Sequence, residues 1–223
     1  MKPFWSFFLI VVLAMFISGC TVPEDKTNEN MAEIRDLIKE RDTLNYTAEY
    51  EYTAAGANKY GFDVTHGYVR YYKVAGAEPI KITTTIRGQD TIREYIYKVP
   101  GENWRKDCRV VNDTNVIDYG GGSSEIPFFD DGIAGLNTSS FSISVISPST
   151  AAGASRCFSI VERGTDDFYG EICYNDNGIA TSMMSSVKGY PVNETFVLKE
   201  LQMLPEGDTP NITSIIPEKC RLI

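Results

Sequence analysis

Four of the five cysteines have the number and spacing to form two disulfides. An even number of cysteines in an exported chain favours disulfides, and four cysteines allow three different pairings. A hairpin centred on Thr165 would place Cys157 directly opposite Cys173, at a Cα separation that a disulfide can bridge. We therefore expect a Cys157–Cys173 disulfide, which leaves Cys108 to pair with Cys220.

The fifth cysteine, Cys20, follows an apolar run and two small residues in the sequence Ile17-Ser18-Gly19-Cys20. This arrangement resembles a prokaryotic lipoprotein signal, which implies cleavage before Cys20 and a diacylglycerol on its sulfur. The alternatives are a plain N-terminal membrane anchor and a secretory signal that is cut elsewhere. The apolar run is shorter than the roughly twenty residues that span a bilayer. We expect an extracytoplasmic protein, lipid-anchored to the cell membrane at the cell surface or the periplasmic face.

The other polar residues do not predict catalysis. His66 is the only histidine, and the sequence has no Gly-x-Ser-x-Gly motif around a nucleophile. The pairs Asp130-Asp131 and Asp166-Asp167 could offer oxygen ligands to calcium, but neither lies in a regular ligand loop, which favours solvated turns. The glycines at 120–122 lack the Lys and Ser/Thr of a phosphate loop. We expect no enzyme activity, no cofactor and no metal.

The chain contains five Asn-x-Ser/Thr sequons, none with a proline in the middle. In an exported protein these make N-glycosylation plausible. The asparagines are Asn45, Asn112, Asn137, Asn193 and Asn211.

The formal net charge of −9 argues against a nucleic-acid partner, because phosphate binding needs clustered Lys and Arg. Membrane contact would come through the lipid on Cys20. Composition divides the chain into a signal peptide at 1–19, a tether at 20–30, one domain at 31–204 and a C-terminal coil at 205–223. The domain carries a long insertion at 118–153 that has no clear period.

Residues 31–42 have helical spacing, with Met31, Ile34 and Ile38 on one face and Asn30 and Glu33 placed as a capping box. From Tyr46 onward the period becomes two, and β-branched and aromatic residues dominate, which predicts about eight short antiparallel strands in meander order. The candidate segments for these strands number nine: 46–53, 68–74, 80–86, 92–99, 104–111, 156–162, 169–174, 180–187 and 195–204.

A sheet with one apolar face must be covered, and one short helix can do this only if the sheet curls around it. We therefore expect a mainly β fold with one N-terminal α-helix, in which a curved antiparallel sheet forms a half-open barrel around the helix. The helix, the run Tyr46-Thr-Ala-Glu-Tyr-Glu-Tyr-Thr53, the strand with Tyr95-Ile-Tyr97, and Trp104 resemble the lipoprotein-carrier superfold over residues 30–111 and 155–204. That superfold includes LolA, LolB, LppX and LprG.

The resemblance implies an unclosed barrel whose hydrophobic interior accepts acyl chains, with a lipid or a lipoprotein as the ligand. The candidates for a lipid-binding face are Tyr50, Tyr52, Ile82, Ile86, Ile96 and Trp104. The alternative function is a surface-anchored interaction or structural module with no small ligand. An apolar cavity of several hundred Å3 would favour the lipid-binding function. A filled interior would favour the interaction or structural module.

Overall fold

The computed structural model describes residues 24–58, 61–99, 101–102, 104–118, 125–148, 153–165, 167–188, 190–208 and 211–221. The lipoprotein-type signal with Cys20, the glycines at 120–122 and Asp166 lie outside these residues. Within them, no helix combines the length and the apolar character needed to cross a membrane.

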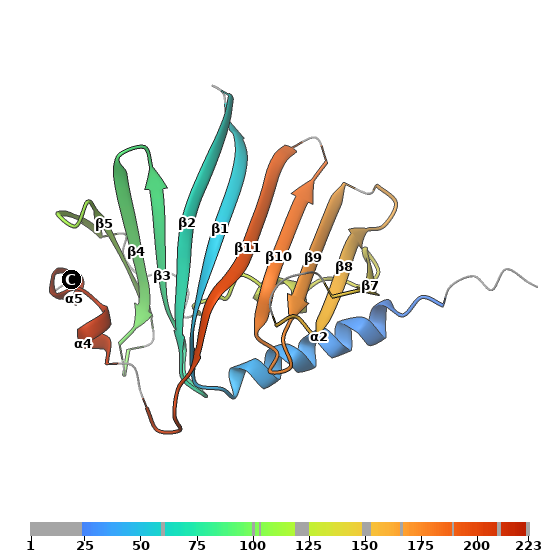
Figure 1. Cartoon of the computed structure of the whole chain (residues 1–223), viewed down its shortest axis with the longest axis horizontal. Helices are drawn as coiled ribbons and strands as arrows, with labels where there is room; N and C mark the ends of the chain where they lie inside the picture. Colours follow the sequence, from blue (N-terminus) through green and yellow to red (C-terminus); the bar gives the residue numbers. More distant parts are fainter. Residues whose placement is uncertain are drawn as a thin grey trace, which may run out of the picture.

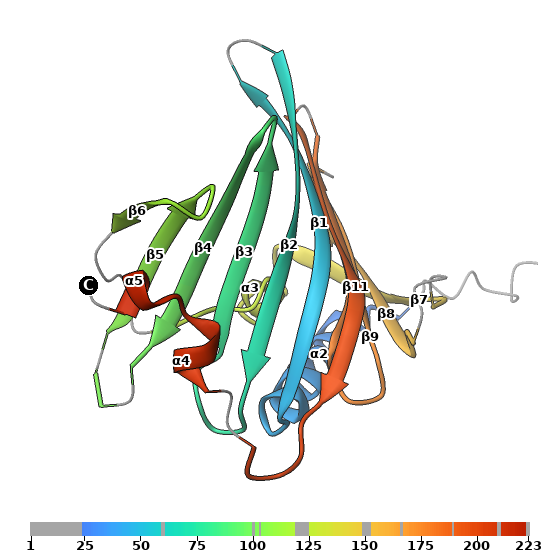
Figure 2. The ribbon, with the colours of Figure 1, turned by 60° about the vertical axis from the view of Figure 1, so that its left-hand side comes forward.

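Eleven strands form one antiparallel sheet, which is curved and does not close (Figures 1 and 2). In chain order they are β1 (Tyr46–Asn58), β2 (Gly61–Lys73), β3 (Ile80–Arg87), β4 (Asp90–Lys98), β5 (Arg105–Val111), β6 (Asn115–Asp118), β7 (Phe141–Ile146), β8 (Arg156–Glu162), β9 (Phe168–Tyr174), β10 (Ala180–Val187) and β11 (Tyr190–Met203). The spatial order is β6-β5-β4-β3-β2-β1-β11-β10-β9-β8-β7. The first and last strands therefore pair at the centre, so two meanders meet where a single one was expected.

Helix α2 (Thr27–Asp42) crosses one face of the β7–β11 half of the sheet (Figure 1). It begins earlier than expected, and the predicted capping box of Asn30 and Glu33 is wrong because both residues lie inside the helix. Asn30 instead donates a 2.7 Å hydrogen bond to the carbonyl of Ile143, whose N–H donates to Thr27 Oγ1 at 3.1 Å. These bonds cover part of the unpaired edge of β7, which would otherwise invite another strand.

The two faces of the sheet carry separate cores. We call the face that bears Tyr46, Ala48 and Tyr50 the inner face, and the opposite one the outer face. On the inner face, α2 packs on β7–β10 and a neighbouring cluster covers β1 and β2. On the outer face a third cluster covers β3–β5. Cross-strand partners share a face, so the strand registers assign the paired, described strand residues to one side or the other.

The C-terminal segment, expected as coil, forms the short helices α4 (Ile212–Ile215) and α5 (Glu218–Arg221) on the outer face of β3–β5 (Figure 2). Its Ile216 is buried against this part of the sheet. Cys220 is bonded to Cys108 with a Cα separation of 5.7 Å, and the Tyr97 hydroxyl donates to the Cys220 carbonyl at 2.7 Å. The tail is ordered because it covers apolar residues that the outer face would otherwise expose.

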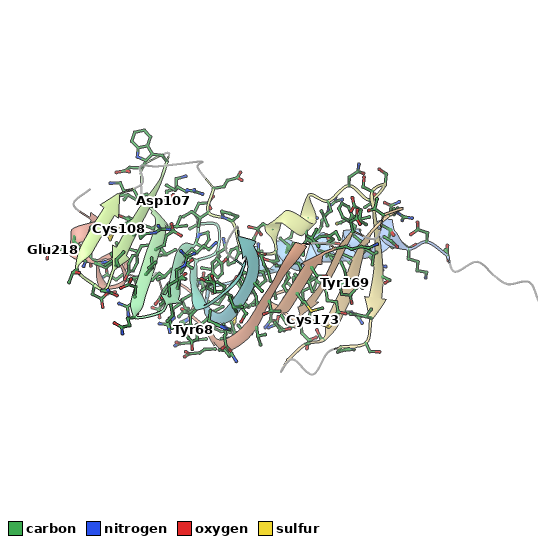
Figure 3. The ribbon with its side chains drawn as sticks, turned by 90° about the horizontal axis from the view of Figure 1, so that it is seen from above. Tyr68, Asp107, Cys108, Tyr169, Cys173 and Glu218 are labelled. Carbon is green, nitrogen blue, oxygen red and sulfur yellow. A yellow bond between two sulfur atoms is a disulfide. The ribbon has the colours of Figure 1, made fainter. Side chains whose placement is uncertain are left out.

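The second disulfide joins Cys157 to Cys173 across β8 and β9, with a Cα separation of 4.1 Å. The register pairs these two residues directly, and Val161 pairs with Tyr169 around the expected turn centre at Thr165. Both expected disulfides are therefore present, and the strand registers place both on the outer face, where Figure 3 labels Cys108 and Cys173.

Candidate ligand-binding groove

The inner face is occupied at its most aromatic point by the chain itself. Phe128 and Phe129, from the expected insertion, pack onto side chains of β1, β2 and β11. The ring of Phe128 stacks on Tyr71 with a centroid separation of 4.4 Å, and Phe129 lies 4.6 Å from Phe196 and 4.8 Å from Tyr50. We call these two phenylalanines the aromatic plug. This part of the half-barrel is therefore a filled core.

Ionic contacts hold the plug to the last turn of α2. Arg41 donates to Asp130 and to Asp131 at 2.7 Å each, and its guanidinium lies 4.1 Å from the ring centroid of Phe128. Asp131 also accepts the N–H of Phe128 at 2.7 Å. The expected solvated turn at Asp130-Asp131 is wrong for Asp130, whose side chain is 1% exposed. Sequence alone offered no signal for this pair, because Arg41 lies on the charged face predicted for the helix.

Burial governs the ionisation of this cluster. It raises the pKa of Asp130 to about 6, although the positive charge of Arg41 opposes the shift. Burial also raises the pKa of Tyr46, Tyr50 and Tyr71, so their hydroxyls stay neutral. Arg41, Asp130 and Asp131 thus form a set of ion pairs inside an aromatic core, next to tyrosines whose hydroxyls are neutral.

A groove of about 870 Å3 opens beside the plug, where β2 and β4 end and β3 begins. Its volume lies in the range of small-molecule sites. Its apolar lining comes from the sheet, from the turns that follow β2 and β4, and from the plug segment; these residues are Tyr72, Val74, Pro79, Ile80, Val99, Ile126, Pro127 and Phe128. Its charged lining consists of Arg41, Asp42, Lys73, Glu78, Lys98, Glu102, Glu125 and Asp131.

Most of the acidic residues of the groove have partners. Asp42 and Asp131 accept hydrogen bonds from Arg41, and Glu78 accepts the N–H of Ile126 at 3.2 Å. Glu102 lies 3.6 Å from the amine of Lys106. The acidic lining is therefore largely committed to the protein's own cations and amides.

The six predicted ligand-binding residues do not share a site. Tyr50 pairs in register with Val69, and Val69 with Thr83, so the neighbouring Ile82 lies on the outer face. Ile86 lies there too, 47% exposed. The prediction of one shared face is wrong because the alternating isoleucines of β3 face the side that the C-terminal helices cover.

The remaining candidates also lie away from the groove. Tyr50 and Tyr52 are on the inner face, where Tyr50 is buried under Phe129 and Tyr52 lies against Phe196. Ile96 is on the inner face as well, opposite Lys81. Trp104 is 61% exposed. None of the six lines the groove.

The view along the strands in Figure 3 separates the two faces, with Tyr68 on the side opposite α2. A smaller hollow of about 340 Å3 lies on that outer face between Tyr68, Tyr72 and Tyr95, and Ile82 is part of its lining. His66 is also on the outer face, exposed, with Nδ1 3.2 Å from the Thr53 hydroxyl.

The sequon asparagines differ in how their side chains are used. Asn112 accepts the N–H of Thr91 and donates to Asp90 at 2.7 Å, and Asn45 accepts the N–H of Ala75. Asn137 and Asn211 are exposed, and each accepts the hydroxyl of its own sequon Ser or Thr. The side chain of Asn193 lies outside the described residues.

No protein-family model matches the sequence, and no curated protein matches it. Among solved structures, the chain is similar to MucB in complex with MucA(peri), at 12% identity and a TM-score of 0.50, over 85% of this chain and 60% of that one. It is also similar to a putative outer membrane lipoprotein-sorting protein domain from Vibrio parahaemolyticus, at 9% identity and a TM-score of 0.35, over 81% and 94%. A LolA superfamily protein from Nitrosomonas europaea aligns at 8% identity and a TM-score of 0.30, over 79% and 94%.

The chain thus spans 60% of the length of the matched MucB chain, and at this identity the likeness concerns the fold alone. The fold itself is an unclosed, curved antiparallel sheet with α2 against its inner face. It is the half-open, mainly β fold with an N-terminal helix that the sequence predicted.

Proposed function

We propose that the protein is an extracytoplasmic, lipid-anchored binding protein that holds an acyl chain or a similar apolar ligand in the groove beside the aromatic plug. The groove itself is the observation that carries this proposal. It combines a volume of about 870 Å3 with apolar walls from Ile80, Val99 and Pro127. Apolar contact with such walls would drive binding, because it removes the ligand from water.

The location rests on two features of the chain. Two disulfides are typical of proteins that fold outside the reducing cytoplasm. The apolar run that ends in Ile17-Ser18-Gly19-Cys20 supports attachment of a lipid to Cys20. Cys20→Ser should release the protein from membranes or leave the signal uncleaved. If this variant is still processed and still partitions into detergent, the lipid anchor is excluded.

Binding in the groove can be tested with a fluorescent fatty acid and two matched variants. Ala77 is exposed and lines the groove, whereas Ala75 is exposed in the same turn but does not line it. Ala77→Trp should weaken binding because the indole fills the groove, and Ala75→Trp should leave it unchanged. Equal binding by both variants would contradict the groove as the site.

The filled inner face favours a second candidate function, an interaction module without a small ligand. The stacked rings of Phe128 and Phe129 leave the aromatic part of the half-barrel packed against itself. The similar MucB structure is a complex with a protein partner, MucA(peri), so this type of fold can serve such a role. Mass spectrometry of lipids extracted from the purified Cys20→Ser protein separates the two candidates. Absence of lipid, together with no binding of the fatty acid, would favour the interaction module.

A further inference from the structure

Lys73 is a buried cation in the wall of the groove. It is the last residue of β2, pairs in register with Tyr46 on the inner face, and is 6% exposed. Its ammonium donates one hydrogen bond, to the Ala77 carbonyl at 2.6 Å. Among the residues that the structure describes, Lys73 forms no ion pair. An ammonium has three N–H donors, so this environment satisfies only part of its capacity.

Two acidic groups that act on Lys73 are engaged elsewhere. Asp42 and Glu78 lie close enough for their charges to oppose the lowering of the Lys73 pKa that burial causes. However, Asp42 accepts hydrogen bonds from Arg41, and Glu78 accepts the N–H of Ile126. A buried charge without a partner is costly, and proteins generally retain one only where it is paired or where it binds something.

The geometry points to Lys73 as the residue that binds an acidic headgroup, with the alkyl chain of the same ligand along the apolar walls of the groove. This inference rests on the proposed function and narrows it from apolar ligands to anionic amphiphiles. The apolar lining of the groove to which Lys73 belongs includes Val74, Ile80 and Phe128. A carboxylate or phosphate would supply the missing acceptors, and such charge-assisted bonds are stronger than neutral ones.

The exposed acidic residues of the groove lining, which we call the acidic rim, are consistent with this assignment. Glu78 and Glu125 are exposed residues of the lining, so a small free anion meets negative charge at the mouth. An amphiphile gains apolar contact along its chain as well, which can carry its headgroup past the rim to Lys73. The groove should therefore select molecules that combine an acidic group with an alkyl chain.

The test uses decanoate, decyl phosphate and decanol, which have the same chain and differ in headgroup. Binding is measured by displacement of a fluorescent fatty acid from the full chain with Cys20→Ser as the background, so that no attached lipid competes. Decanoate should bind about tenfold more tightly than decanol, the size expected for a charge-assisted hydrogen bond. Lys73→Met should remove this preference, so that decanoate and decanol bind with similar affinity. Lys199→Met is the matched control, because Lys199 pairs with Glu51 on the outer face away from the groove.

The outcomes are separable. Equal binding of decanoate and decanol by the unsubstituted background, or a preference for decanoate that persists in Lys73→Met, would overturn the role of Lys73 and leave the groove intact. Failure of all three molecules to bind would overturn the proposed function and this inference with it. Where the preference depends on Lys73, the ratio of decanoate to decyl phosphate identifies the headgroup as that of a fatty acid or of a phosphorylated lipid. A Lys73→Arg variant that keeps the preference would confirm that positive charge is what the site supplies.

Discussion

Arg41 Nη1 lies 2.7 Å from Asp130 Oδ1, and both side chains are almost completely buried. This ion pair connects the last turn of α2 to the segment that carries the aromatic plug, across 89 residues of sequence. Because Asp131 also accepts from Arg41, one guanidinium fixes the position of two adjacent acidic residues. The pair therefore decides how the inner face is filled and where one wall of the groove stands.

Arg41→Met should lower the free energy of unfolding by about 3–5 kcal/mol at pH 7, because it leaves Asp130 buried without its cation. Chemical denaturation monitored by tryptophan fluorescence measures the loss. Adding Asp130→Asn should recover part of it by removing the unpaired charge. Lys39→Met is the control: Lys39 pairs with Asp36 at the surface, and such pairs contribute about 1 kcal/mol or less. Equal losses for Arg41→Met and Lys39→Met would contradict the importance of the buried pair.

The raised pKa of Asp130 predicts a specific pH dependence. The folded pKa is about 6 and the reference value is 3.8, so the folded state keeps its proton at pH values where the unfolded state has lost it. The contribution of Asp130 to stability is therefore fully present below about pH 4 and is lost as the pH rises through 6. Unfolding measured from pH 4 to pH 7 should show this decline in the unsubstituted protein relative to Asp130→Asn. Parallel profiles for the two proteins would show that Asp130 does not titrate in this range.

The two disulfides should differ in how much they stabilise the fold. Cys108–Cys220 closes a sequence separation of 112 residues and Cys157–Cys173 one of 16. The chain-entropy model gives about 5 kcal/mol for the first and about 3 kcal/mol for the second. Replacing both members of each pair by alanine should therefore lower the melting temperature more for Cys108/Cys220. That variant should also expose the outer core, seen as increased binding of a hydrophobic dye. A larger loss from the Cys157/Cys173 variant would contradict this order.

Glycosylation requires access to the side-chain amide of the sequon asparagine. We therefore expect glycans on some of the sequons and not on others. Asn112, Asn137 and Asn211 are all exposed, but the side-chain amide of Asn112 donates a hydrogen bond to Asp90. Glycopeptide mass spectrometry of protein from its native host should find glycans on Asn137 and Asn211 and none on Asn112. A glycan on Asn112 would show that its turn opens before or during modification.

Local pattern was sufficient for most elements of the sheet. Alternation of apolar and polar residues predicted nine of the strand segments, and the turn around Thr165 predicted the Cys157–Cys173 bond through simple opposition of residues. These features depend on neighbours in sequence. The sequence also predicted that the sheet curls around a helix. The reason is that one helix could not cover the apolar faces of so many strands on a flat sheet.

Only the tertiary structure decided which side of each strand faces inward. Alternation separates Ile80 and Ile82 from Lys81 and Thr83, but it does not say which set meets the interior, since that depends on what covers each face. The C-terminal helices cover the isoleucine side of β3, and the plug covers the tyrosine side of β1. Pairing of β1 with β11, the contact of Arg41 with Asp130 and the position of Lys73 in the groove wall likewise join residues far apart in the chain. Such contacts are set by packing across the whole sheet, and the periodicity of a single segment carries no information about them.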